Sequence, residues 1–186
     1  MTLIAQDRAY LLRWARRSVE HAAKHRARLE MPEPEGEDLK ARRGAFVTLR
    51  EEGRLRGCVG NLEPRDPLYL EVSRAAFSAS MRDPRFPPVE PEETASLLIE
   101  ISVLTRPVGI DCTSEDVVVA QMIPHRHGVT LRAGSRIGTF LPKVWSTLGT
   151  REAFMTQLKR KAGWGPAEWP DDAKVEFYEA EDFAER

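Results

Sequence analysis

The sequence predicts an α+β fold, with a mainly antiparallel sheet flanked by helices. Two pairs of short β-favouring runs are each joined by a glycine-containing turn, and a further strand shows clear alternation. The segments with helical periodicity do not alternate regularly with these strands, which argues against a doubly wound parallel sheet. Glycine-rich phosphate-binding loops between a strand and a helix are also missing from the sequence.

The first segment is predicted to be an amphipathic helix over residues 7–28. Its apolar positions recur at spacings of three and four, as expected for one buried face, and they are Leu12, Ala15, Val19 and Ala22. The helix should end before the acidic segment 30–38, which contains two prolines and is predicted to be a solvated connector.

A hairpin and a second helix should follow. Residues 45–49 and 54–60 are the β-favouring runs, and Glu51-Glu52-Gly53 is predicted to join them as a three-residue turn. Asp66 is a suitable helix cap with Pro67 at the first helical position, and the helix should stop before Pro84. The proline-rich run that follows predicts a rigid surface loop.

The remaining elements are a central strand, a short helix, a second hairpin, a third helix and a terminal strand. The strand over 97–105 should place Ile99, Ile101 and Val103 on one face. Alternation, cap residues and glycine stop signals place the other elements at 113–122, 128–132 with 136–140, 150–162 and 173–180.

Composition limits the classes of function. The chain has 186 residues and a formal net charge of -1, so it presents no overall field for nucleic acid or for an anionic membrane. Apolar runs long enough to span a bilayer are missing, and the first residues do not resemble a signal peptide, so a cytoplasmic location without membrane association is expected. Its two cysteines are too few for a disulfide framework.

Cys58 is the first candidate for chemistry. Strict alternation in the strand over 54–60 would place Arg56, Cys58 and Gly60 on one face, with Gly57 on the other. A guanidinium on the same face would favour a thiolate, whereas free cysteines are most often buried and structural. The two glycines suggest a bulge, or a close approach by another backbone or a ligand.

The proline-rich loop supplies a second candidate. Asp83 and Arg85, beside Phe86, would present a carboxylate and a cation to a polar ligand or to a partner. Asp83 has an equally plausible local role, because loops with several prolines often need side chains to accept hydrogen bonds from exposed amides.

The spacing of the histidines does not predict a metal centre. His125 and His127 would point the same way in an extended segment, but they lack a nearby carboxylate or cysteine at ligand spacing. Ordinary histidines on a surface turn are therefore predicted, with no metal ligands.

Several ordered motifs together resemble one known family. The runs LRGCVGNLEP, AAFSASMRDPRFPPV, IEISVLTRP and FLPKVW are similar to those of the AMMECR-domain family, which in prokaryotes is the AmmeMemoRadiSam system protein A family. The hallmark Leu-Arg-Gly-Cys-Ile-Gly is matched by residues 55–60 with Val59 for Ile, and Asp-Pro-Arg-Phe is matched by residues 83–86. Asn61 stands where Ser or Thr is common.

The resemblance implies an AMMECR-like α+β domain over residues 1–186, with two unequal lobes, the second being smaller. It also implies association with a Memo-like protein and with a radical SAM enzyme. It specifies no reaction and no cofactor for this chain.

Two hypotheses follow. In the first, the chain is an accessory binding component that recognises a small polar ligand or a partner. Its binding residues would be Gly57, Gly60, Asn61, Asp83 and Arg85. In the alternative, it is an enzyme that uses Cys58 as a thiolate nucleophile, with Arg56 stabilising negative charge. The neutral overall charge and the lack of interleaved aromatics argue against nucleic acid as a partner.

Overall fold

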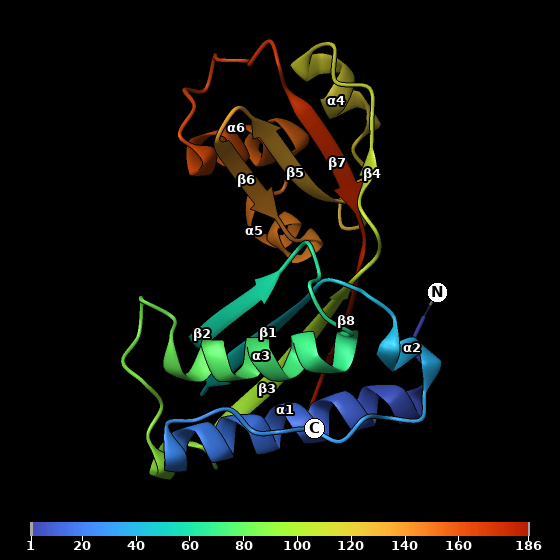
Figure 1. Ribbon diagram of the computed structural model, residues 1–186. Coiled ribbons are helices and arrows are strands. Elements are labelled where there is room, and N and C mark those ends of the chain that lie inside the picture. The colour runs from blue at the N-terminus through green and yellow to red at the C-terminus, as the bar shows by residue number, and fades with distance from the viewer. Residues whose placement is uncertain (1, 186) are drawn as a thin grey trace. The chain divides into compact units, whose positions relative to one another are not determined.

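The computed structural model describes residues 2–185, which form two compact units (Figure 1). Residues up to 104 and from 181 onward make unit 1, and residues 105–180 make unit 2. Each unit contains one four-stranded sheet, so the predicted α+β class with antiparallel pairing is confirmed, with two sheets in place of one. Within residues 2–185, every helix is too short or too polar to cross a bilayer.

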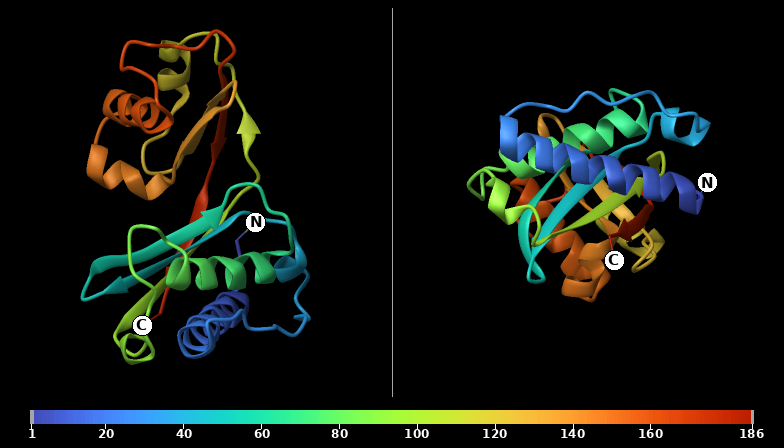
Figure 2. Two further views of the ribbon diagram at one scale, coloured as in Figure 1. Left: turned by 60° about the vertical axis from the view of Figure 1, so that its left-hand side comes forward. Right: turned by 90° about the horizontal axis from the view of Figure 1, so that it is seen from below.

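Unit 1 is a sheet of order β2-β1-β3-β8 with helices on one face (Figure 2). Its elements are α1 (Ala5–His25), α2 (Glu37–Lys40), β1 (Ala45–Glu51), β2 (Arg54–Asn61), α3 (Leu68–Met81), the 3-10 helix η1 (Pro91–Glu93), β3 (Leu97–Leu104) and β8 (Ala180–Ala184). The predicted inward face of β3 is confirmed, since Ile99, Ile101 and Val103 are fully buried beneath α1 and α3. Burying such side chains supplies most of the drive for folding.

The first helix ends three residues earlier than its periodicity predicts. Arg26 adopts a left-handed conformation with φ of 54°, and its N–H bonds to the carbonyl of Ala22, which closes the helix. The guanidinium of Arg26 then donates to Glu90 and to the carbonyl of Val89. A side chain from a distant segment thus fixes the end of α1.

The β1–β2 hairpin is confirmed, but its turn and its register differ from the prediction. Glu52 and Gly53 both have positive φ, so the turn has two residues, in the geometry that suits a tight hairpin. The register shifts between Leu49, which faces Gly57, and Arg50, which faces Leu55. Arg56 is therefore the extra residue of a β-bulge, and Leu55 pairs on the same side as Thr48 and Cys58 and not on the side of Gly57.

Helix α3 begins one residue later than predicted, because Pro67 is its N-cap and Leu68 its first residue. Asp66 does not cap the helix with its side chain but forms an ion pair with Arg74. Within residues 2–185, no side chain caps the first turn of α3, and Glu71 instead accepts the N–H groups of Arg65 and Asp66, which precede the helix. The helix ends at Met81, before Pro84, as predicted.

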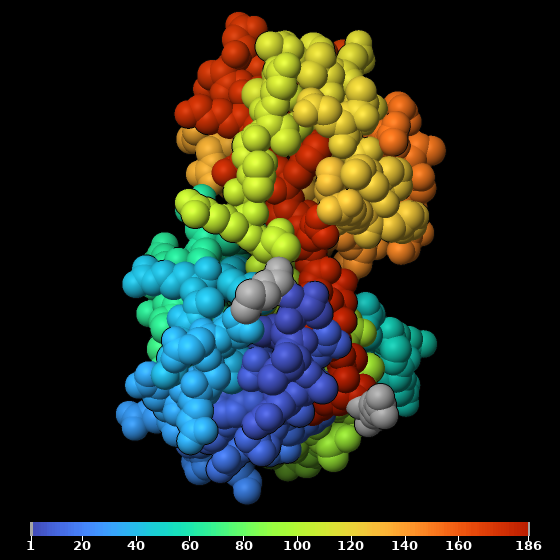
Figure 3. Space-filling view, turned by 90° about the vertical axis from the view of Figure 1, so that its right-hand side faces the viewer, coloured from blue at the N-terminus to red at the C-terminus, as the bar shows by residue number. Residues whose placement is uncertain are grey.

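The predicted terminal strand over 173–180 is confirmed as β7, and it is followed by a further strand, β8, that was not predicted. Residues 174–178 form β7 in unit 2, whereas β8 pairs beside β3 in unit 1. Ser102 donates to Asp182, and the N–H of Glu185 donates to Ile99, so β8 runs antiparallel to β3. The acidic end of the chain lies against α1 (Figure 3), where Glu185 forms an ion pair with Arg16 at 2.5 Å.

Unit 2 is a sheet of order β4-β7-β5-β6 packed against α6 around a separate core. Its elements are β4 (Val108–Gly109), α4 (Glu115–Gln121), β5 (Gly128–Ala133), β6 (Arg136–Phe140), the 3-10 helix η2 (Pro142–Val144), α5 (Trp145–Leu148), α6 (Arg151–Ala162) and β7 (Lys174–Tyr178). Ser114 and Thr150 cap α4 and α6 by accepting backbone N–H groups, and Gly163 ends α6 in the left-handed region, as predicted.

Gly57 is expected to be intolerant of a side chain, because an added Cβ would lie 2.3 Å from the carbonyl oxygen of Ala79 in α3. Gly57→Ala should therefore lower the free energy of unfolding by about 2–4 kcal/mol, measured by urea denaturation. Gly109→Ala is the matched control, since nothing lies within 4 Å of its added Cβ. Equal stability of the two variants would show that α3 does not rest on β2 as described.

Candidate functional site

Cys58 lies in the middle of β2, an edge strand of the unit 1 sheet. It faces Thr48 across the hairpin, and the Thr48 hydroxyl donates to its sulfur at 3.2 Å. The thiol is partly buried and is not in a disulfide. Val47 and Leu49, the neighbours of Thr48 in β1, point into the hydrophobic core. Cys58 therefore lies on the opposite side of the sheet.

Asp83 and Arg85 close on the backbone of Cys58. The Asp83 carboxylate accepts the N–H of Cys58 at 2.9 Å, and the Arg85 guanidinium donates to the carbonyl of Cys58 at 3.2 Å. The two side chains also form a bidentate pair, with Nε and Nη2 of Arg85 on the two carboxylate oxygens at 2.9 and 2.6 Å. The interaction gives the exposed edge of β2 both an acceptor and a donor, as a neighbouring strand would.

The electrostatics of Asp83 follow from these bonds. Its side chain is 3% exposed. The hydrogen bonds from Arg85 hold the pKa of Asp83 well below its usual range, with the Cys58 N–H adding to the effect and burial opposing it. Asp83 also accepts the backbone N–H of Arg85 at 3.1 Å. The local role considered for Asp83, accepting loop amides, is therefore present, together with a long-range bond to β2.

Arg56 is bound to the same loop by different contacts. Its guanidinium makes two bonds to the carboxylate of Glu93, at 2.8 and 3.0 Å, and one to the carbonyl of Pro87 at 2.9 Å. Across residues 2–185, no hydrogen bond or ion pair joins Arg56 to Cys58. The cation that contacts Cys58 is Arg85, 27 residues away in sequence, and this pairing was not predicted.

Gly60 and Asn61 are held by packing and hydrogen bonds within the protein. An added Cβ on Gly60 would lie 2.2 Å from the carbonyl oxygen of Ala45, so the close approach predicted for this glycine is that of a neighbouring strand. Asn61 donates to Glu71 at 3.1 Å. Glu71 is 1% exposed and also accepts the backbone N–H groups of Arg65 and Asp66.

Three residues of this region were missed by sequence reasoning: Thr48, Glu71 and Glu93. Glu93 had a recognisable signal, because Glu90 and Glu93 have the three-residue spacing of a capping box around Pro91. Thr48 and Glu71 had none, since a threonine in a strand and a glutamate in a helix are common. Their partners become evident only from the fold.

His125 and His127 occupy a turn of unit 2, consistent with the predicted position. His125 has a positive φ of 61°. His127 accepts the N–H of Ile123 on Nδ1, its ring lies tilted against that of Phe177 with centroids 4.6 Å apart, and burial lowers its pKa. Within residues 2–185, no three His, Cys, Asp or Glu side chains are grouped as a metal site would need.

Contacts from β1 and from the loop after α3 surround Cys58. The Cys58 sulfur accepts a hydrogen bond from the Thr48 hydroxyl, and within residues 2–185 no His, Asp or Glu side chain is bonded to the sulfur as a general base would be. The residues of the loop over 82–90, here called the Asp83 loop, are fixed to β2 by Asp83, Arg85 and Arg56. The result is a rigid polar surface at the edge of the sheet.

Comparison with known proteins finds one matching family model, two similar relatives and one similar crystal structure. A family model described as AMMECR1 matches residues 12–183. Protein MK0488 of Methanopyrus kandleri is 36% identical, with 98% of this chain and 90% of the relative covered, and protein TK0174 of Thermococcus kodakarensis is 38% identical, with 95% and 89% covered. The crystal structure of the uncharacterised protein PH0010 from Pyrococcus horikoshii has a TM-score of 0.87 at 36% identity, covering 95% of this chain and 90% of that one.

Asp83→Asn should lower the free energy of unfolding by about 2–4 kcal/mol at pH 7, because it removes a buried carboxylate from Arg85 and Cys58. The folded pKa of Asp83 is depressed. Its stabilisation is therefore complete above the unfolded pKa, near 3.9, and declines as pH falls below it. Urea denaturation from pH 7 to pH 2.5 measures the difference between the two proteins.

The matched control is Asp171→Asn, since Asp171 is exposed. This change should alter stability by less than about 0.5 kcal/mol. A difference between wild type and Asp83→Asn that stays constant down to pH 2.5 would contradict the depressed pKa.

Proposed function

Because the chain belongs to the AMMECR1 family, we propose that it is an accessory binding component whose strand β2, here called the Cys58 strand, and Asp83 loop recognise a small polar ligand or a partner protein. The motif resemblance supplies the partner classes, a Memo-like protein and a radical SAM enzyme. The geometry of unit 1 supports the proposal in three steps.

The first support is the state of Arg85. Its Nε and Nη2 are bound to Asp83, which orients the guanidinium, and the side chain is 53% exposed. Within residues 2–185, Nη1 donates to no protein acceptor. An arginine held in this way offers two further N–H groups to a carboxylate, a phosphate or a carbonyl. This orientation, with donors to spare, is the observation that carries the proposal.

The second support is the rigidity of the surface around Arg85. Pro84, Pro87 and Pro88 are exposed and have fixed φ angles, and the carbonyl of Pro87 is bound by Arg56. The Arg85 guanidinium also lies 5.5 Å from the centre of the Phe86 ring. A surface already ordered before binding loses little conformational entropy in a complex.

The third support is the weakness of the alternative, in which Cys58 is a nucleophile and Arg56 stabilises negative charge. The guanidinium of Arg56 is bound to Glu93, and its side chain is only 11% exposed. The bonds around Cys58 also link its backbone to a structural pair, so the position serves the strand edge whatever its thiol does.

Arg85→Gln should weaken binding to a Memo-like or radical SAM protein of the same organism by about tenfold, because a charged contact is lost. Arg82→Gln is the matched control, an exposed arginine of the same loop that lies over Phe77, and it should change the affinity less than about threefold. Calorimetry gives the affinities, and thermal unfolding checks that each variant is folded.

Equal weakening by both variants, or no binding by the wild-type chain to either protein, would contradict the partner proposal. Cys58→Ser separates the two hypotheses in a mixture reconstituted from the three proteins. If the chain is a binding component, the mixture that contains Cys58→Ser should keep the full activity of the wild-type mixture. A loss greater than about 100-fold with unchanged affinity would support the nucleophile instead.

A further inference from the structure

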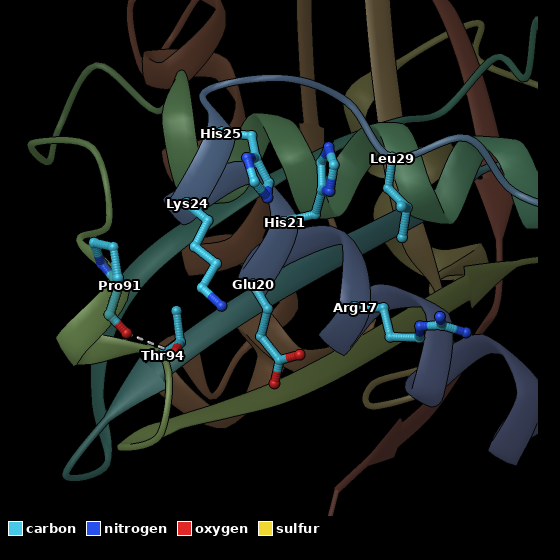
Figure 4. A pocket seen from close by; sticks show the side chains of 8 residues that line it. All are labelled: Arg17, Glu20, His21, Lys24, His25, Leu29, Pro91 and Thr94. Carbon is cyan, nitrogen blue, oxygen red and sulfur yellow. Dashed lines mark hydrogen bonds between the residues drawn. The ribbon is translucent and has the colours of Figure 1, made fainter.

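A cavity of unit 1 lies away from Cys58, over the outer face of α1 (Figure 4). It has a volume of about 500 Å³ and is lined on α1 by Arg17, Glu20, His21, Lys24 and His25. Pro91 and Thr94, from η1 and the residue after it, line it too, and the view shows the Lys24 side chain extending toward Thr94. None of these residues belongs to the Cys58 strand or to the Asp83 loop.

The cavity gathers cations that the protein leaves unpaired. Elsewhere on α1, Arg8 and Arg16 form ion pairs with Glu181 and Glu185, and Arg26, just after the helix, forms one with Glu90. Within residues 2–185, Arg17 and Lys24 form no ion pair and no hydrogen bond with a carboxylate. The helix therefore uses some of its basic residues to hold unit 1 together and presents the others to the cavity.

Arg17 is also positioned without using its donors. Its guanidinium carbon lies 4.4 Å from the centre of the Trp14 ring, and Trp14 is 9% exposed. A guanidinium resting on a buried ring is held by a cation–π contact, which restricts its orientation. Its N–H groups remain free to bind an anion at the edge of the cavity.

From these features we infer that the cavity binds a small molecule that carries a phosphate group. An arginine, a lysine and two histidines provide the charged and polar donors that phosphate oxygens prefer. Glu20 adds an acceptor, which favours a phosphorylated compound with a hydroxyl or amine group. The volume lies within the range of ordinary small-molecule sites.

Nucleic acid fits the same surface less well. Its recognition relies on an extended basic track with aromatic side chains on which bases stack. The cavity is bounded by Pro91 and Thr94, the neighbouring Trp14 ring is covered by Arg17, and the whole chain has a net charge of -1. A compact ligand is therefore favoured.

Titration of the full chain with inorganic pyrophosphate at 150 mM salt, followed by calorimetry, tests the site. The wild type should bind at a single saturable site. Arg17→Gln and Lys24→Gln should each weaken binding about tenfold. Arg13→Gln is a closely matched control, because Arg13 is another exposed α1 arginine lying over an aromatic ring, that of Tyr10, and does not line the cavity.

Histidine resonances locate the ligand independently of affinity. The chain has four histidines, of which His21 and His25 line the cavity whereas His125 and His127 belong to unit 2. Pyrophosphate should shift the imidazole Cε1–H signals of His21 and His25 and leave the other two in place. His21→Gln and His25→Gln assign the signals.

Three results would overturn the inference: no saturable binding by the wild type, equal weakening by Arg13→Gln, or shifts confined to His125 and His127. A nucleic-acid surface would be identified instead, and the small-molecule site rejected, if the chain binds single-stranded RNA more strongly than pyrophosphate. In that case Arg13→Gln, Arg17→Gln and Lys24→Gln should all weaken RNA binding alike. Arg85→Gln should retain pyrophosphate binding, so failure of this inference is distinguishable from failure of the proposed function.

Discussion

The bond between the Asp83 carboxylate and the backbone of Cys58 is the contact on which the candidate site depends. An edge strand leaves N–H and C=O groups free to pair with another chain. Here a side-chain pair, Asp83 and Arg85, satisfies both groups of Cys58 and so ends the sheet. The same pair sets the direction of the Arg85 guanidinium. Protection of the edge and presentation of a cation are thus two results of one interaction.

Other carboxylates repeat this arrangement in unit 1. Glu71 joins the segment before α3 to Asn61, Glu93 joins η1 to Arg56, and Glu185 joins the end of the chain to Arg16 and to the N–H of Ile99. Each accepts a backbone N–H and also contacts a second side chain. Irregular segments are therefore held by charged acceptors where the ladders of helices and strands do not reach.

Local patterns in the sequence were enough for the elements whose cause is local. The alternation of apolar residues predicts β3 from a few adjacent positions, and the cap residues Ser114 and Thr150 predict the starts of α4 and α6 in the same way. Strand β8 could not be found in this way, because its short acidic run is stabilised by β3 and by α1, far away in sequence. The side-chain partners within the candidate site could not be predicted for the same reason. The motif residues were identified, but the partner of Arg56 is Glu93, 37 positions away.

The position of β8 affects the order in which the two units can fold during synthesis. Unit 2 is encoded inside unit 1, so residues 105–180 leave the ribosome before the fourth strand of the first sheet exists. Until then β3 is an open edge, and Arg8 and Arg16 lack Glu181 and Glu185. Vectorial synthesis therefore allows unit 2 to fold first. The sheet of unit 1 can be completed only after the last residues of β8 have been synthesised.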